Sequence, residues 1–186
     1  MTTPIHVLGF AGSLRKGSYN AALLRAASEI LPASMTLEIF DLAPIPLYNA
    51  DEEAAGFPEP VQRFKERIAA ADALLIATPE YNYSVPGVLK NALDWASRPP
   101  AASTLSGKPM AMMGVGGRSG TIRAQLQLRQ IALGTNLLPL NRPELAVAMG
   151  WEKFDAEGRL TDEATREQLG KLLVALADWT WRLRNV

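Results

Sequence analysis

Residues 12–20, GSLRKGSYN, combine the residue types that bind an anion in a short loop. They follow the apolar run IHVLGFA at 5–11, which is typical of a buried strand. Successive backbone N–H groups of such a loop can point into one concavity, with the positive end of a following helix behind them. The side chains that can add hydrogen bonds are Ser13, Arg15, Ser18 and Asn20. The stretch therefore predicts a phosphate-binding loop.

The charge around this loop is positive although the chain as a whole is neutral. Nineteen Lys and Arg residues balance nineteen Asp and Glu residues, yet the first acidic residue is Glu29. A neutral chain does not hold nucleic acid by bulk charge, so a charged ligand must be bound locally. Four charge-assisted hydrogen bonds of roughly 1.5–3 kcal/mol each account for most of the ~8 kcal/mol of a micromolar ligand.

Two nucleotide-binding motifs come close to this loop and do not match it. GSLRKGS imitates GxxxxGK[ST], but Ser18 and Tyr19 stand where the lysine and the magnesium-binding hydroxyl are needed, which argues against an ATP hydrolase. The loop also lacks GxGxxG. For this loop taken alone, a capped turn whose glycines only permit the bend is the alternative.

A second polar stretch, TPEYNYSVPG at 78–87, comes at the end of the apolar run ALLIAT. Tyr81 and Tyr83 flank an asparagine, and we expect Ser84 to be the N-cap of the next helix, with Pro86 in its first turn. A rigid loop with two aromatic rings suits the edge and face of a planar heterocycle. Taken alone, such tyrosines are more often packing or surface residues, and it is the neighbouring anion loop that favours binding.

A third glycine-rich stretch, GVGGRSG at 114–120, ends another apolar run. Its glycine spacing imitates a dinucleotide fingerprint, but no Asp or Glu lies between Asp94 and Glu144 to bind a ribose. Arg118 is a candidate contact for the phosphate of an incoming NADPH, with a solvated surface arginine as the equal alternative.

The elements that would position these loops are strands and helices in alternation. Apolar runs of strand length occupy 5–11, 36–40, 73–78 and 109–115, with a weaker fifth at 136–140 or 143–148. Helical spacing occurs at 22–30, 61–71, 85–96, 122–133 and 162–184. This pattern predicts an α/β three-layer sandwich with a five-stranded parallel sheet. Ligands of such sheets lie at the carboxyl ends of the strands, where the three loops would meet.

Composition limits the class of protein further. With 186 residues and 48% hydrophobic content, we expect one domain over 1–186. There is no cysteine and the one histidine, His6, lies in a strand, so neither a metal site nor a hydrolytic triad is expected, and redox chemistry would need a cofactor. The irregular stretch 41–60 suggests a lid or an oligomer contact. Without a signal peptide or a membrane-spanning run, we expect a cytoplasmic protein.

GSLRKGSYN, followed later by PEYNYSVPGVLKNALDW, resembles the NADPH-dependent FMN reductase family of flavodoxin-like proteins, especially its bacterial quinone and chromate reductases. The resemblance implies sheet order 2-1-3-4-5. It assigns the FMN phosphate to Ser13, Arg15, Ser18, Tyr19 and Asn20. It assigns the isoalloxazine and ribityl region to Pro79, Glu80, Tyr81, Asn82, Tyr83 and Ser84. Gly116 and Gly117 would let the backbone approach the ring, and Glu80 need not be a catalytic acid, since it can act through its backbone or orientation.

The resemblance also implies a function. We expect electrons to pass from NADPH or NADH through bound FMN to quinones, with chromate, azo dyes and free flavin as further acceptors and no side chain as proton relay. A flavodoxin-type electron carrier is the alternative, but such carriers are usually strongly acidic and this chain is neutral. A regulatory nucleotide-binding module is a third hypothesis, and it predicts a colourless protein.

The family is typically dimeric or tetrameric, and its quinone reductases use an Arg, Tyr and Glu network between subunits. Arg123 and Glu144 match two of these positions, whereas Leu126 occupies the position of the tyrosine. We therefore expect a homodimer or homotetramer. Whether Arg123 and Glu144 belong to such a network or form a simple solvated pair stays open at this point.

Overall fold

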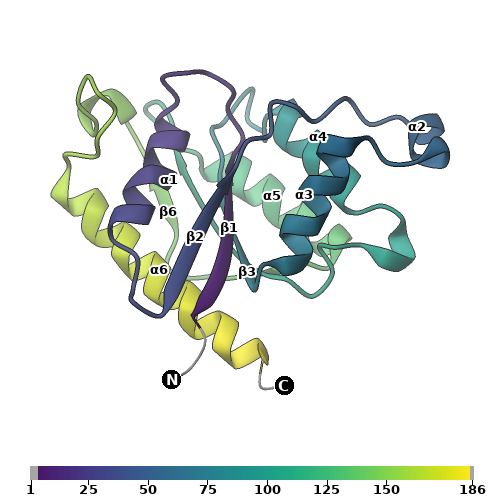
Figure 1. Cartoon of the computed structure of the whole chain (residues 1–186). Helices are drawn as coiled ribbons and strands as arrows, with labels where there is room; N and C mark the ends of the chain where they lie inside the picture. Colours follow the sequence, from purple (N-terminus) through teal and green to yellow (C-terminus); the bar gives the residue numbers. More distant parts are fainter. Residues whose placement is uncertain (1–3, 185–186) are drawn as a thin grey trace.

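A parallel sheet forms the middle layer of the computed structural model, which describes residues 4–184 (Figure 1). The single domain expected over 1–186 is therefore described without residues 1–3 and 185–186, which lie outside that range. The first four strands are β1 (Ile5–Ala11), β2 (Met35–Phe40), β3 (Ala73–Ala77) and β4 (Pro109–Val115). Together with β5 (Leu138–Pro139) they lie in the order β2-β1-β3-β4-β5 and pair in parallel, which confirms the predicted order 2-1-3-4-5.

The fifth position of the sheet holds two short strands instead of one. β5 (Leu138–Pro139) pairs with the beginning of β4, and β6 (Leu145–Val147) pairs with its end. Both segments proposed from the sequence as the fifth strand thus pair with β4, and the expected five strands become six. The stretch between them contains Pro143, which has no N–H to donate to a ladder.

Helices cover both faces of the sheet (Figure 1). One face carries α1 (Tyr19–Glu29) and α6 (Glu163–Arg184), and the other carries α3 (Glu59–Ala70), α4 (Gly87–Ala96) and α5 (Ile122–Thr135). Successive strand residues point to opposite faces, so Val7 belongs to the core under α1 and α6, and Leu8 to the core under the other three helices. β3 and β4 are buried along their whole length, which explains their continuous apolar sequences.

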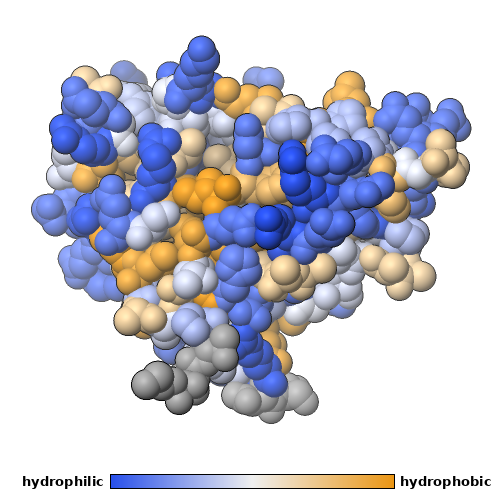
Figure 2. Space-filling model, in the orientation of Figure 1, coloured by the Kyte–Doolittle hydropathy of each residue, from blue (hydrophilic) through white to orange (hydrophobic). Residues whose placement is uncertain are grey.

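The edge strand β2 is the least covered part of the sheet. Only its first residue, Met35, is buried, and Ile39 is 44% exposed. Figure 2 shows hydrophobic surface on this side of the molecule, over the region of β2 and α1. No helix within residues 4–184 combines the length and the apolar character that crossing a membrane requires.

The stretch 41–60 is attached to α4, where the indole N–H of Trp95 donates to Pro46 O at 2.9 Å, although the sequence predicts no element in this stretch. It contains the short helix α2 (Ala50–Ala55). Tyr48 donates a hydrogen bond to Glu53 at 2.7 Å, and the same carboxylate accepts one from Arg98 at 2.9 Å. The hydrogen bonds from Tyr48 and Arg98 lower the pKa of Glu53 below its ordinary value. These contacts argue against a freely moving lid.

Two 3₁₀ turns complete the chain. η1 (Pro100–Ala102) follows α4, and η2 (Gly150–Glu152) follows β6. The C-terminal helix begins and ends close to the predicted limits of 162 and 184, with Glu163 in its first turn and Arg182 and Arg184 in its last. This distribution of charge complements the helix dipole.

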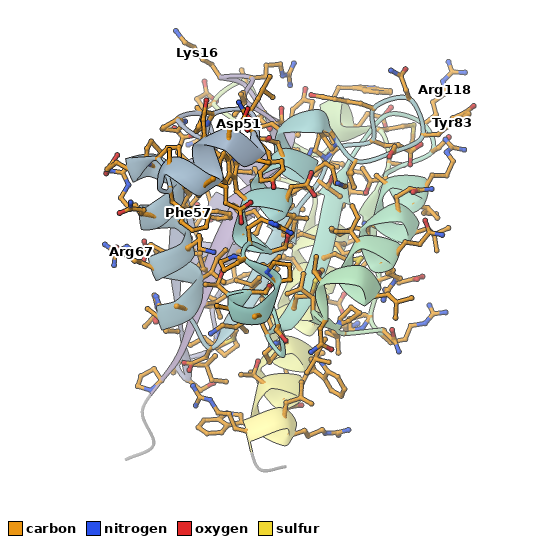
Figure 3. All side chains as sticks on the ribbon, turned by 90° about the vertical axis from the view of Figure 1, so that its right-hand side faces the viewer. Lys16, Asp51, Phe57, Arg67, Tyr83 and Arg118 are labelled. Atoms are coloured by element: carbon orange, nitrogen blue, oxygen red, sulfur yellow. The ribbon has the colours of Figure 1, made fainter. Side chains whose placement is uncertain are left out.

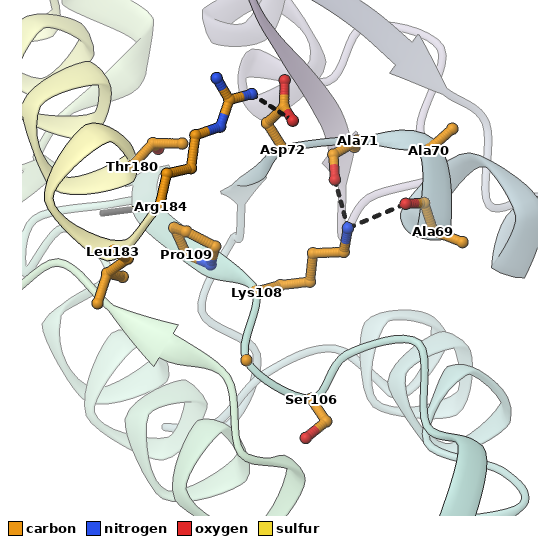
Figure 4. A pocket seen from close by; sticks show the side chains of 11 residues that line it. Ala69, Ala70, Ala71, Asp72, Ser106, Lys108, Pro109, Thr180, Leu183 and Arg184 are labelled. Carbon is orange, nitrogen blue, oxygen red and sulfur yellow. Dashed lines mark hydrogen bonds and ion pairs between the residues drawn. The ribbon is translucent and has the colours of Figure 1, made fainter. Parts of the chain in front are cut away.

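The amino ends of β3 and β4 meet beside the end of α6, around a cavity of about 310 Å³ (Figure 4). Lys108 donates hydrogen bonds to the carbonyl oxygens of Ala69, at 3.0 Å, and Ala71, where α3 ends. Asp72 pairs with Arg184 and also accepts the N–H of His6 at 2.8 Å. Burial lowers the pKa of Lys108. The charged groups at this end thus cap α3 and attach α6 to the sheet.

We expect Lys108→Met to lower the free energy of unfolding by about 1–2 kcal/mol, because two carbonyl groups at the end of α3 lose their donor. Urea unfolding followed by circular dichroism measures the change. Lys171→Met is the control, since it removes only an exposed pair with Glu167 and should change stability by less than about 0.5 kcal/mol. Equal stability of Lys108→Met and the native protein would contradict the capping role.

Candidate functional site

The carboxyl ends of β1, β3 and β4 meet at one edge of the sheet, at the top of Figure 1. Gly12 N–H donates to Ala77 O at 2.8 Å and Thr78 N–H donates to Met113 O at 2.9 Å, so adjacent loops leave the sheet side by side. Figure 3 shows one residue from each loop, Lys16, Tyr83 and Arg118, at this edge. The structure therefore brings the three predicted stretches together.

The first loop presents a row of N–H groups that have no acceptor within residues 4–184. They belong to five consecutive loop residues and to the first two residues of α1, namely Ser13, Leu14, Arg15, Lys16, Gly17, Tyr19 and Asn20. Ser18 ends the loop as the N-cap of α1, where its hydroxyl accepts the N–H of Ala21 at 3.3 Å. Unpaired N–H donors at the positive end of a helix are the features that an anion-binding site requires, so this loop is a candidate for one.

Two side chains of the loop remain near its rim. The exposed Arg15 guanidinium donates to Gly17 O and lies 5.2 Å from the ring centre of Tyr19. Ser13 Oγ lies 3.4 Å from the hydroxyl of Tyr81 and so links the first loop to the second.

The side chains of Tyr19 and Asn20 point into the protein instead. Asn20 is 3% exposed, and its amide pairs with Val115, donating to the carbonyl and accepting the N–H, each at 2.9 Å. The ring of Tyr19 stacks on Phe154, with 5.3 Å between ring centres. These two residues offer their N–H groups to the loop, while their side chains attach α1 to β4 and to the segment after η2.

The second loop is a two-residue hairpin turn. Tyr81 and Ser84 exchange hydrogen bonds between N–H and carbonyl, both at 3.0 Å, and Asn82 and Tyr83 have φ angles of 51° and 65°. A left-handed conformation at Tyr83 is uncommon for a bulky residue and is typical of constrained functional loops. The rings of Tyr81 and Tyr83 are 51% and 69% exposed.

The prediction that Ser84 caps α4 is wrong, because α4 begins at Gly87 with Pro86 in the cap position. Val85 precedes a proline, and the residue before proline is disfavoured in the helical conformation. The helix therefore cannot start as early as the spacing suggested, and Ser84 closes the hairpin turn. Pro79, at the start of the loop, is buried, and its carbonyl accepts the hydroxyl of Thr78 at 2.8 Å.

Glu80 is directed to the beginning of α5. Its carboxylate accepts the N–H groups of Arg123 at 2.9 Å and Ala124 at 3.2 Å, and the guanidinium of Arg123 at 2.7 Å. The side chain is only 8% exposed. Glu80 thus acts as a cap for α5, a role for which its position in the sequence carried no signal.

The Arg123–Glu144 pair that the sequence left open does not form within the chain. Arg123 is engaged by Glu80, and Glu144 pairs with Arg129 at 3.9 Å and with Arg142 at 3.3 Å. Arg123 lies in the first turn of α5 and is held by Glu80, whereas Glu144 lies beside Arg129, which comes later in the same helix.

The third loop is held against the end of β6. Gly116 N–H donates to Val147 O at 2.9 Å, and Gly150 N–H donates to Gly116 O at 3.1 Å. A Cβ atom on Gly116 would lie 2.2 Å from the carbonyl oxygen of Gly120, whereas one on Gly117 would meet nothing within 4 Å. Gly117 and Arg118 are exposed. Of the two glycines predicted to approach the ring, Gly116 is needed for packing within the loop, and Gly117 faces open space.

The described residues hold no group of three or more His, Cys, Asp and Glu side chains close enough to bind a metal ion. The edge offers unpaired N–H donors on the first loop, and exposed aromatic rings and Gly117 on the other two, which are features that suit an anion and a flat ring. All thirteen predicted site residues lie on these three loops or in the first turn of α1.

Comparison with known proteins gives four findings. Residues 5–152 match the family model described as NADPH-dependent FMN reductase. The chain is 54% identical, over the full length of both proteins, to an NAD(P)H-dependent FMN reductase of Pseudomonas aeruginosa. It is 45% identical to an NADPH:quinone oxidoreductase of Arabidopsis thaliana, covering 97% of this chain and 94% of the relative. The structure of FerB from Paracoccus denitrificans, a flavoenzyme NAD(P)H:(acceptor) oxidoreductase, matches with a TM-score of 0.85 and 35% identity over 96% of this chain and 98% of FerB.

The third loop predicts different outcomes for two similar substitutions. Gly116→Ala should lower the melting temperature by several degrees, roughly what 1–3 kcal/mol of overpacking costs, because its Cβ would clash with a backbone oxygen. Gly117→Ala should leave the melting temperature unchanged, since its Cβ meets open space. Thermal unfolding of both variants measures the difference. Similar melting temperatures for the two would show that the loop is not packed as described.

Proposed function

Because the chain belongs to the NADPH-dependent FMN reductase family, we propose that the three loops bind FMN, with the phosphate on the first loop and the ring beside the other two. The protein is an NAD(P)H-dependent oxidoreductase that uses FMN. The observation that carries the placement of the cofactor is the row of unpaired N–H groups between β1 and α1.

The first loop fits a phosphate dianion in both charge and space. Seven backbone N–H groups there lack an acceptor in the described chain, and Arg15 and Lys16 supply positive charge while no acidic residue occurs in the loop. A Cβ atom on Gly17 would meet nothing within 4 Å, so the backbone is open to a ligand. Hydrogen bonds from such donors to a charged oxygen are about twice as strong as neutral ones.

The second and third loops suit the two sides of a flat ring. The hairpin turn holds its backbone in one conformation, so its free N–H and carbonyl groups can meet the polar edge of a heterocycle without further ordering. Gly117 lets the main chain come close on the other side. Bound FMN supplies hydride and electron transfer, and the protein's part is to place donor and acceptor within about 3–3.5 Å of the ring.

No side chain is assigned a proton-transfer role in this proposal. Glu80, the acid nearest the turn, has its carboxylate engaged by α5 and Arg123. The residues proposed to contact FMN are those of the sequence prediction, with the qualification that Asn20 and Tyr19 act through N–H groups and Glu80 through the position of its loop.

Quinones are the acceptors that the site favours. The chain's Arabidopsis relative is named as a quinone oxidoreductase, and the exposed rings of Tyr81 and Tyr83 offer a flat apolar rim to a flat apolar substrate. Chromate, azo dyes and free flavin are further acceptors under this proposal, since an open ring face selects weakly by shape. A cytoplasmic location also belongs to the proposal.

Arg118 is the proposed contact for the dinucleotide donor. It is exposed, it forms no hydrogen bond or ion pair within residues 4–184, and Figure 3 shows it at the same edge of the sheet as Tyr83. A guanidinium in this place can pair with a phosphate of NADPH or NADH.

A homodimer or homotetramer is the proposed assembly. The outer face of α5 exposes three large apolar side chains, Ile122 at 58%, Leu126 at 55% and Leu133 at 85%. Contact with a second copy would remove them from water, which supports α5 as part of the interface.

The purified protein incubated with FMN and passed through a desalting column should stay yellow. NADPH should bleach the colour and benzoquinone should restore it over many cycles, which follows from an oxidoreductase and not from a flavodoxin-type carrier. Stopped-flow absorbance at the flavin band measures both steps. A protein that stays colourless contradicts the flavin site, and one that is coloured but is bleached only over minutes favours the carrier.

Arg15→Ala should weaken FMN binding by about 10- to 100-fold, as expected for one charge-assisted hydrogen bond to a phosphate. Arg63→Ala is the matched control, because Arg63 lies on α3 and pairs with Glu59, away from all three loops. Fluorescence titration of the apoprotein with FMN measures the affinities. If Arg15→Ala weakened the binding of riboflavin, which has no phosphate, as much as that of FMN, Arg15 would contact another part of the ligand.

Leu126→Arg should shift the protein toward the monomer by placing a charge in the proposed interface. Val174→Arg is a control of matched exposure, 52% against 55%, on a helix of the other layer. Sedimentation velocity at several concentrations gives the mass. A monomeric native protein, or a native-like mass for Leu126→Arg, would contradict the role of α5.

A further inference from the structure

The turn at residues 81–84 is held in a conformation that its own sequence does not favour. Both central residues, Asn82 and Tyr83, have positive φ angles, and neither is glycine. Asparagine adopts this conformation readily, but a tyrosine in it is strained, and such strain persists only where surrounding contacts compensate for it. The structure must therefore contain a contact that stabilises Tyr83 in place.

Arg123 is the residue that makes this contact. Its guanidinium lies over the ring of Tyr83, 4.0 Å from the ring centre, and with this contact in place Tyr83 is still 69% exposed. A guanidinium over an aromatic face is attracted to it and, being planar, can also stack on it. The apex of the turn is thus supported from one side, by one residue of α5.

The guanidinium itself is fixed by the residue that precedes the turn. Arg123 Nε donates to Glu80 Oε1 at 2.7 Å, while Glu80 Oε2 accepts the N–H groups of Arg123 and Ala124. Glu80 is 8% exposed and lies at the positive end of α5, so its carboxylate is held by four interactions that include the helix dipole. Arg123 therefore bridges the base of the turn at Glu80 and its apex at Tyr83.

We infer that Arg123 is a positioning residue for the flavin loop: anchored on Glu80 and stacked on Tyr83, it keeps residues 81–84 in the left-handed turn that meets the ring. The inference rests on the proposed function for the identity of the bound ring as flavin, but the contacts of Arg123 with Glu80 and Tyr83 form without any ligand. It gives Arg123 a task within its own subunit, independent of a contact between subunits.

Amide hydrogen exchange of the apoprotein tests directly whether Arg123 stabilises the turn at residues 81–84. In Arg123→Gln, the N–H groups of Tyr81 and Ser84, which pair with each other across the turn, should exchange about tenfold faster, as loss of an ion pair and a cation–π contact allows. The N–H of Leu128 inside α5 should be unchanged, which separates a loosened turn from an unfolded helix. Unchanged exchange at Tyr81 and Ser84 would overturn the inference.

Two further variants identify the contact responsible. Arg123→Lys keeps the charge but has no planar face and no Nε donor, so it should restore little of the protection. In a Tyr83→Leu background, Arg123→Gln should increase the exchange rates much less than tenfold, because the ring that Arg123 contacts has been removed. Native exchange rates at Tyr81 and Ser84 in Arg123→Lys would show that stacking on Tyr83 does not stabilise the turn. A tenfold effect of Arg123→Gln in the Tyr83→Leu background would show the same.

The FMN-loaded protein gives an independent readout. Arg123→Gln should slow flavin reduction by NADPH and shift the visible circular dichroism of the flavin, with the KM for NADPH unchanged within about twofold, since a misplaced ring and not a lost dinucleotide contact is the cause. Arg129→Gln, which removes a charge from the same helix without touching the turn, should match the native protein. A raised KM with unaltered kcat and dichroism would overturn the inference. Failure of the native protein to bind FMN would reject the proposed function alone, because hydrogen exchange still tests the turn.

Discussion

The common direction of all strands in the sheet is the constraint on which the site depends. Parallel strands place their carboxyl ends at one edge, so the loops after β1, β3 and β4 meet without any contact having to draw them together. The same constraint buries β3 and β4 on both faces, which leaves the strand ends as the place where their backbone polar groups reach loops and solvent. Helices α1 and α5 then begin at this edge, and their positive ends face it.

The polar residues of the edge divide into those that face outward and those that face the protein. Arg15, Tyr81 and Tyr83 are exposed and available to a ligand, whereas Asn20 and Glu80 are buried and serve backbone groups of β4 and α5. The buried pair matters because an unpaired N–H or carbonyl in the interior costs free energy, about 1–3 kcal/mol for each group. The loops of the candidate site are therefore attached to the rest of the protein by two buried side chains, Asn20 and Glu80, that hydrogen-bond to backbone groups.

Local sequence predicted the limits of strands that are buried on both faces. It failed to predict the limits of elements that depend on a proline or on contacts between distant residues. The limits of β1 and β4 agree with the predicted 5–11 and 109–115, because strands buried on both faces are read directly as apolar runs. The fifth strand was ambiguous because β5 and β6 share one position around Pro143. The Ser84 cap was wrong because Val85 precedes Pro86 and stays out of the helix. The helix α2 was missed because none of its residues is buried, so it carries no apolar periodicity.

The sequence by itself determined the fold class and the three candidate stretches, because these depend on patterns within short windows: apolar runs and glycine-rich polar loops after a strand. The order of the sheet came only with the resemblance to a family, because strand order depends on contacts between distant segments. Only the tertiary structure decided which way each polar side chain faces. Asn20 and Val115 are 95 positions apart, as Glu80 and Arg123 are 43 apart, and no local pattern marks such partners. The left-handed turn at Tyr83 belongs to the same class, since a conformation that the residue itself disfavours is set by the contacts that surround it.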